Sequence, residues 1–130
     1  MKRLRRRKFP LEGVLFILLF ASGGFAGAAD YPARQVRVVV PFAAGGGADT
    51  LSRVLFAKLS EDLGQQFIID NRGGGSGTIG AGLVAKAPAD GYVILHDATG
   101  FSINPSMFSS LPYNPARDFD PVYLAGTVPN

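Results

Sequence analysis

The chain has 130 residues, a formal net charge of +3 and no cysteine. The absence of cysteine excludes disulfide bonds and thiolate metal sites. Six of its 13 lysine and arginine residues lie within the first eight positions, and the residues after Ala29 hold seven bases and nine acids, a net charge of −2. Because no basic cluster remains there to neutralise phosphates, we expect no nucleic-acid partner.

Residues 1–29 have the pattern of a secretory signal peptide. The basic start is followed by an apolar run over residues 14–20 and then by small residues, and cleavage after Ala28 or after Ala29 fits the pattern equally. A single membrane anchor is the alternative, but the apolar run is shorter than the ~20 residues that a bilayer span needs. We therefore expect export to the periplasm and a mature chain that begins near Asp30.

Strands and helices alternate in the next part of the chain. A β-branched run predicts a strand over residues 35–40, which Pro41 ends, and apolar residues at helical spacing predict a helix that Asp49 or Thr50 caps and Gly64 ends. The further predicted elements are a strand over 66–70, a helix over 79–87 and a strand over 92–96. Alternation with short links predicts an α/β fold with a parallel βαβαβ core.

The pattern loosens after Asp97. We expect a loop over residues 98–105, a helical turn over 106–110 and proline-stiffened connections over 111–121. Residues 122–128 predict another strand, and the sequence stops just past it without a closing element. We therefore expect a truncated chain.

Two glycine-rich turns, residues 41–50 and 71–80, each follow a predicted strand and each open a helix. Backbone N–H groups at such a turn form an anion site, and ligands of parallel sheets bind at the carboxyl ends of the strands. A purely structural role, in which the glycines only permit positive φ, is the alternative. Asp49 is either a helix cap or a carboxylate that faces a hydroxyl, an amine or a water.

The second turn also matches a dinucleotide-binding fingerprint. Gly75–Gly80 reads G-x-G-x-x-G, and Asp97 lies about twenty residues further on, where a ribose-binding acid is expected. This motif makes a nucleotide-dependent enzyme the alternative function. The export signal and the four residues 71–74 between strand and motif count against it. The single histidine, His96, is interpreted as a core or rim residue, and no metal-ligand spacing or nucleophile motif is present, so we expect no enzyme, cofactor or metal.

Several motifs in order carry a family resemblance. They are Tyr31-Pro32, Val38 to Asp49, Leu63-Gly64-Gln65, Asp70-Asn71-Arg72, Gly77 to Gly80, Ala89 to Tyr92 and Leu111 to Phe119. This order resembles the Bug-type (TctC-like) periplasmic solute-binding receptors of tripartite tricarboxylate transporters. The resemblance implies that residues 30–130 form the N-terminal part of the first lobe of a periplasmic-binding-protein fold, with the second lobe missing. It also implies a receptor, not an enzyme, that closes on a small organic carboxylate and delivers it to membrane permease subunits. Closure around a hinge needs two lobes, so we expect this chain alone to bind weakly or not at all.

The resemblance further implies that the first turn grips the ligand carboxylate through backbone N–H groups and waters, beside the loops after the neighbouring strands. Two departures from the family pattern are Ala44 and Gly73, which stand where proline is usual. Polar residues after the third strand either donate hydrogen bonds to a ligand or form turns and caps. The candidate ligand-binding residues are Phe42, Ala44, Gly45, Gly46, Gly47, Asp49, Thr50, Asn71, Gly75, Ser76, Gly77, Thr99, Ser102 and Asn104.

Overall fold

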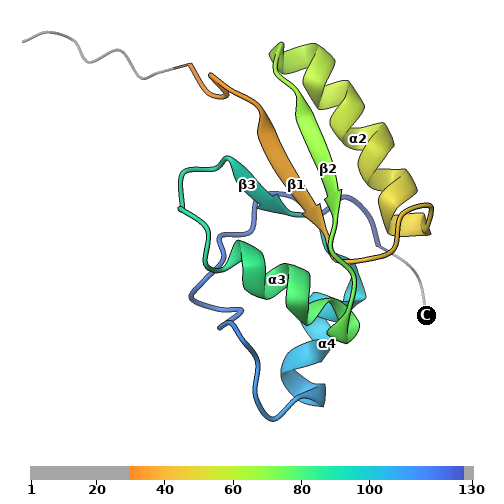
Figure 1. Ribbon diagram of the computed structural model, residues 1–130, viewed down its shortest axis with the longest axis vertical. Coiled ribbons are helices and arrows are strands. Elements are labelled where there is room, and N and C mark those ends of the chain that lie inside the picture. Colours follow the sequence, from red (N-terminus) through yellow and green to blue (C-terminus); the bar gives the residue numbers. More distant parts are fainter. Residues whose placement is uncertain (1–29, 128–130) are drawn as a thin grey trace, which may run out of the picture.

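Three parallel strands form the centre of the computed structural model, which describes residues 30–127 (Figure 1). They are β1 (Val36–Val40), β2 (Phe67–Asn71) and β3 (Val93–Leu95), in the spatial order β2-β1-β3. Both pairings of β1 are parallel, with Val40 opposite Asn71 on one side and Val39 opposite Leu95 on the other. The predicted parallel βαβαβ core is confirmed.

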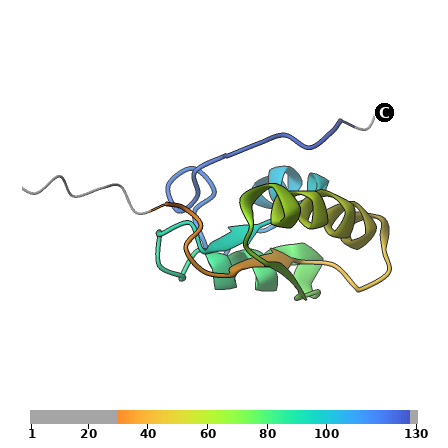
Figure 2. The same ribbon diagram turned by 90° about the horizontal axis from the view of Figure 1, so that it is seen from above.

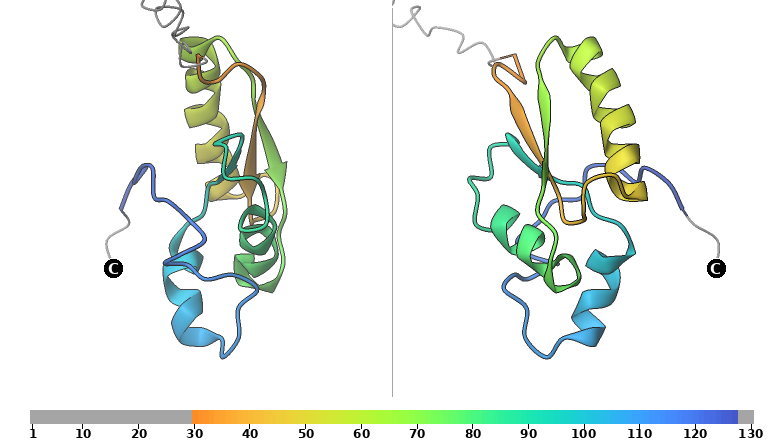
Figure 3. Two further views of the ribbon diagram at one scale, coloured as in Figure 1. Left: turned by 90° about the vertical axis from the view of Figure 1, so that its left-hand side faces the viewer. Right: turned by 45° about the vertical axis from the view of Figure 1, so that its right-hand side comes forward.

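Helices cover both faces of this sheet. The long helix α2 (Gly47–Leu63) lies on one face and the short helix α3 (Thr78–Val84) on the other (Figure 2). A single 3-10 turn, η1 (Gly75–Gly77), precedes α3. Helix α4 (Thr99–Met107) follows β3 and lies near η1, beyond the carboxyl ends of the strands (Figure 3).

The core lies between β1 and α2. The valines of β1 at positions 36, 38, 39 and 40 have no exposed surface, as expected for a central strand covered on both faces. Phe56 of α2 stacks on Phe67 of β2 and contacts the half-buried His96 edge-on, with ring centroids 5.7 and 5.6 Å apart. His96 is thus a rim residue of the core, as the sequence predicts.

Three expectations about local structure are wrong. Helix α2 begins at Gly47, and its N-cap is Gly46, not Asp49 or Thr50. Residues 99–107 form one helix, whereas the sequence predicts a loop over 98–105 and a helical turn over 106–110. The predicted strand from Val122 is absent over 121–127, because these residues pair with no neighbouring strand and a strand needs a ladder partner.

The predicted signal peptide, residues 1–29, and residues 128–130 lie outside the described residues. Within 30–127, no helix combines the length and the apolar character that a membrane crossing requires.

Candidate functional site

The two glycine-rich turns meet at the carboxyl edge of the sheet. The N–H of Arg72 donates to the carbonyl of Val40 at 2.8 Å, so β2 stays paired with β1 up to the start of both turns. Gly73 packs so closely on the first turn that an added Cβ would lie 3.6 Å from the backbone nitrogen of Ala43. The turns, distant in sequence, therefore form one continuous backbone surface.

Asp49 is the side chain that organises the first turn. Its Oδ2 accepts the N–H of Gly45 at 2.8 Å and the Nε–H of Arg53 at 2.9 Å, and its Oδ1 accepts an amide hydrogen of Asn71 at 3.0 Å. The residue is 2% exposed. The hydrogen bonds from Arg53 and then from Gly45 lower the pKa of Asp49 to about 2. Its carboxylate is therefore ionised and fully engaged within the protein.

Asn71 links the two turns. Besides its bond to Asp49, its amide Nδ2 donates to the carbonyl of Phe42 at 3.2 Å, and its Oδ1 accepts from Arg53 at 3.3 Å. The sequence predicts Asn71 as a site residue but misses Arg53. The available signal was the i,i+4 spacing of Asp49 and Arg53, which places opposite charges side by side on a helix.

The N-terminus of α2 has the properties of an anion site. Its N-cap is Gly46, and none of the described side chains caps it; the hydroxyl of Thr50 donates instead to the carbonyl of Gly46 at 3.0 Å. The residues from Ala44 to Gly47 are exposed. The positive end of the helix macrodipole and the N–H groups of the first turn thus lie at the surface, where a carboxylate can reach them.

The residues predicted beyond the first turn differ in exposure. Gly75 and Ser76 are exposed and Gly77 is buried, while Thr99 and Ser102 are exposed on α4. Asn104 is 1% exposed, and its Nδ2 donates to the carbonyl of Ser76 at 2.9 Å. The structure therefore brings Asn104 to the second turn and leaves Thr99 and Ser102 at the helix surface.

Asp97 also lies at this edge. Its Oδ1 accepts the N–H of Ala98 at 2.6 Å, whereas its buried Oδ2 has no hydrogen-bond partner among the described residues. Burial raises the pKa of this carboxyl group. A Cβ added at Gly77 would lie 3.6 Å from Oδ2, so this oxygen faces the second turn.

The topology does not suit the dinucleotide fingerprint. Gly75–Gly80 follows β2, and β1 separates β2 from β3, which leads to Asp97. In a dinucleotide site the motif and the acidic residue follow neighbouring strands. Gly80 has a packing role, because a Cβ there would lie 2.8 Å from Cβ of Pro41.

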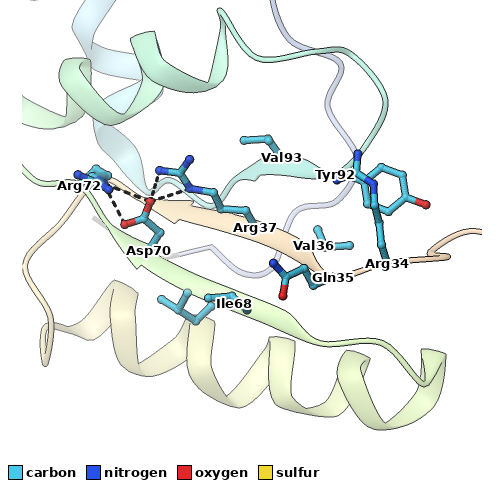
Figure 4. Close-up of a pocket in the computed structure, with 10 residues that line it drawn as sticks. Arg34, Gln35, Val36, Arg37, Ile68, Asp70, Arg72, Tyr92 and Val93 are labelled. Carbon is cyan, nitrogen blue, oxygen red and sulfur yellow. Dashed lines mark hydrogen bonds and ion pairs between the residues drawn. The ribbon is translucent and has the colours of Figure 1, made fainter.

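A pocket of about 590 Å³ lies on the face of the sheet away from α2, and Arg72 of the second turn is among its lining residues (Figure 4). Arg37 and Arg72 both pair with Asp70 there, and Arg34 lies 3.8 Å over the ring of Tyr92. Burial alone would raise the pKa of Asp70. The hydrogen bonds from Arg37 and Arg72 have the larger combined effect, so the pKa of Asp70 lies below its ordinary value. No predicted site residue lines this pocket.

Residues 30–127 hold no group of three or more potential metal-binding side chains.

Comparison with known proteins places these features in a family. The model of the tripartite tricarboxylate transporter family receptor (TctC) matches residues 51–129. The chain is 40% identical over 124 residues to the UPF0065 protein in the tcbD-tcbE intergenic region of Pseudomonas sp. strain P51. That match covers 95% of this chain and 37% of the relative. The chain thus spans about a third of the length of its curated relatives.

Solved structures of periplasmic binding proteins are also similar to part of this chain. R. palustris Rpa4515 with adipate is 49% identical with a TM-score of 0.64, over 67% of this chain and 29% of that one. The periplasmic binding protein BugD is 44% identical with a TM-score of 0.65, over 70% and 30%. MatC (Rpa3494) from Rhodopseudomonas palustris with bound malate is 38% identical with a TM-score of 0.65, over 71% and 32%. The three-stranded unit therefore resembles part of one lobe of periplasmic binding proteins.

Proposed function

The chain belongs to the family of tripartite tricarboxylate transporter receptors. We propose that it captures a small organic carboxylate for a membrane permease. The family consists of solute-binding receptors and not of enzymes. The observation that carries the proposal is the exposed N-terminus of α2, which no described side chain caps and which Asp49 and Asn71 hold against the second turn.

We infer that one carboxylate group of the ligand binds at this helix end. The N–H groups of Gly45 and Gly46 already donate to Asp49 Oδ2 and to the carbonyl of Ala43, whereas Gly47 and Ala48 begin α2, where N–H groups have no partner within the helix. A carboxylate placed there gains hydrogen bonds from Gly47 and Ala48 and the favourable macrodipole. Relatives with bound adipate and malate support a ligand of the dicarboxylate class.

The predicted site residues divide into two groups in this proposal. The exposed residues and the half-buried Phe42 line the ligand, and the other buried or half-buried residues keep the turns in place. The lining residues are Phe42, Ala44, Gly45, Gly46, Gly47, Thr50, Gly75, Ser76, Thr99 and Ser102, and the supporting residues are Asp49, Asn71, Gly77 and Asn104.

We further propose that residues 1–29 act as a cleavable export signal and that the receptor works in the periplasm. The basic and apolar pattern of these residues supports this location, and so do relatives described as periplasmic binding proteins. The permease subunits of a tripartite transporter are then the partners that receive the ligand.

Expression of the whole chain in a Gram-negative host tests the proposal. Mass spectrometry of the periplasmic fraction should find a mature chain that begins at Ala29 or Asp30. Closure around a ligand needs two lobes, so calorimetry of this chain alone should give weak binding at most. The complete gene product should give saturable binding of adipate, malate or another member of a panel of di- and tricarboxylates, and no heat with NADH. Absence of binding by the complete gene product across the panel contradicts the carboxylate proposal, and saturable NADH binding favours the nucleotide alternative.

A further inference from the structure

The second glycine turn adopts a conformation that needs outside support. Gly74, Ser76 and Gly77 have φ of 121°, 53° and 88°, and Gly75 between them has φ of 54°. Glycine reaches this left-handed region readily, but Ser76 does so at a cost in energy. Within the turn, one backbone hydrogen bond runs from the N–H of Gly77 to the carbonyl of Gly74 at 3.0 Å.

Asn104 supplies the support from α4. Its Nδ2 donates to the carbonyl of Ser76 at 2.9 Å, and the side chain is 1% exposed. The Ser76 carbonyl and the Gly77 N–H belong to the same peptide plane. That plane is therefore held on both sides, by Asn104 through its oxygen and by Gly74 through its hydrogen.

The position of α4 makes this contact possible. A Cβ at Gly100 would lie 3.2 Å from the Ser76 carbonyl oxygen, which is a tight contact, so glycine at this position favours the close approach of the helix to the turn. The Oδ1 of Asp97 accepts the N–H of Ala98, the residue just before α4, at 2.6 Å. Contacts from two elements thus converge on one peptide group.

We propose that Asn104 is a positioning residue for the binding site: it locks the Ser76–Gly77 peptide and so holds the exposed Gly75 and Ser76 in one orientation beside the first turn. The inference rests on the proposed function, because it assigns a purpose to the ordered turn. A residue that served only the fold would affect stability without a separate effect on ligand affinity.

Three variants of the whole chain test it. Asn104→Ala removes the donor, and Asn104→Asp keeps the shape but places a carboxylate against the Ser76 oxygen and close to Asp97. Ser106→Ala, at an exposed position on the same helix, is the matched control. The first readout is amide hydrogen exchange of Gly77 in the ligand-free chain, and the second is the Kd for adipate and malate by calorimetry, with the same substitutions in the complete gene product.

We expect Gly77 to exchange about fivefold to tenfold faster in Asn104→Ala, and the Kd for the bound dicarboxylate to rise by a similar factor, as for the loss of one hydrogen bond. Ser106→Ala should match the wild type in both. Asn104→Asp should recover at pH 4 relative to pH 7, because a protonated carboxyl can donate to the Ser76 carbonyl. This recovery keeps the test decisive if Asn104→Ala does not fold.

The inference is overturned if Gly77 exchanges at the wild-type rate in both Asn104 variants, or if exchange accelerates while the Kd stays unchanged. Failure of the wild type to bind any dicarboxylate contradicts the proposed function, and with it the purpose assigned to the turn. Gly77 exchange then still shows whether Asn104 locks the peptide. The two failures are therefore distinguishable.

Discussion

At the level of single residues, the charge of Asp49 holds the first turn, and its effect should depend on pH. The folded pKa of about 2 lies below the ordinary value of 3.8. The carboxylate therefore stabilises the fold above pH 3.8, and this contribution is lost as the pH falls through about 2. We expect Asn in place of Asp49 (Asp49→Asn) to lower the free energy of unfolding at pH 7, and the deficit to shrink between pH 4 and pH 2. Urea unfolding at several pH values measures this.

Asp62→Asn is the control for this prediction. Asp62 pairs with Lys58 at 2.7 Å, but its side chain is 54% exposed, so its removal should change stability by less than about 0.5 kcal/mol at any pH. A deficit in Asp49→Asn that is the same at pH 7 and pH 2.5 would contradict the assigned role of the charge.

Asp97 should show the opposite pH dependence. Burial raises its folded pKa above 3.8, so the native chain loses stability as the pH rises from 3.8 through the folded pKa. Asp97→Asn does not titrate and keeps an acceptor for the start of α4. We expect its stability relative to the wild type to be higher at pH 7 than at pH 3. Thermal unfolding at the two values measures the difference, and a relative stability that does not change with pH counts against a buried carboxyl group.

The sequence predicts much of the site at this scale, but not how the side chains act. The sequence leaves Asp49 as either a helix cap or a ligand-facing carboxylate, and the structure has it bonded to Gly45, Arg53 and Asn71. Sequence spacing shows which residues share a turn. It does not show that Asn71 lies opposite Val40 and so reaches Asp49, because that depends on strand register.

At the level of elements, the packing of α3 on β1 depends on the absence of a side chain at Gly80. An added Cβ would lie 2.8 Å from Cβ of Pro41 and 3.0 Å from the carbonyl oxygen of Arg72, which is backbone and cannot move aside alone. We expect Gly80→Ala to destabilise the chain by about 1–3 kcal/mol, as overpacking does. Chemical denaturation measures the loss.

Gly47→Ala is the matched comparison within α2. Nothing lies within 4 Å of a Cβ at Gly47, which is the first residue of the helix and does not have positive φ. There the substitution should stabilise by about 0.4–1 kcal/mol, because it reduces the freedom of the unfolded chain. Equal effects of the two substitutions would contradict the close approach of α3 to Pro41.

The sequence predicts an element correctly where the contacts that stabilise it lie close in sequence, and fails where they come from distant residues. The valine run of β1 contains its own signal, and both β1 and α2 form where expected apart from the first residues of α2. The buried face of α2 differs from the predicted apolar stripe, because Leu51 and Val54 are 48% and 68% exposed whereas Ser52 is buried. Helix α4 contains Gly100 and Pro105, which weaken a helical pattern. Its stabilising contacts, Asp97 to Ala98 and Asn104 to Ser76, include a partner distant in sequence. A pattern within one segment cannot reveal such a partner.

At the level of the whole molecule, the described residues leave apolar surface uncovered. Within residues 30–127, β2 and β3 each pair with β1 alone, and the β3 residues are only partly buried. Val122, Tyr123 and Leu124 are 88%, 80% and 72% exposed. The chain spans about a third of its relatives' length. Exposed apolar groups beside unpaired strand edges favour association.

We therefore expect the chain to self-associate as its concentration rises. Sedimentation velocity from ~5 to ~200 µM should show a growing share of dimers and larger species, as expected for exposed apolar patches. The double variant Val122→Asp with Leu124→Asp should remain monomeric over the same range, because charges at exposed positions oppose association without disturbing the core. Lys86→Asp, at another exposed position, controls for added negative charge and should associate like the wild type. If all three chains sediment alike, residues 122–124 do not drive association.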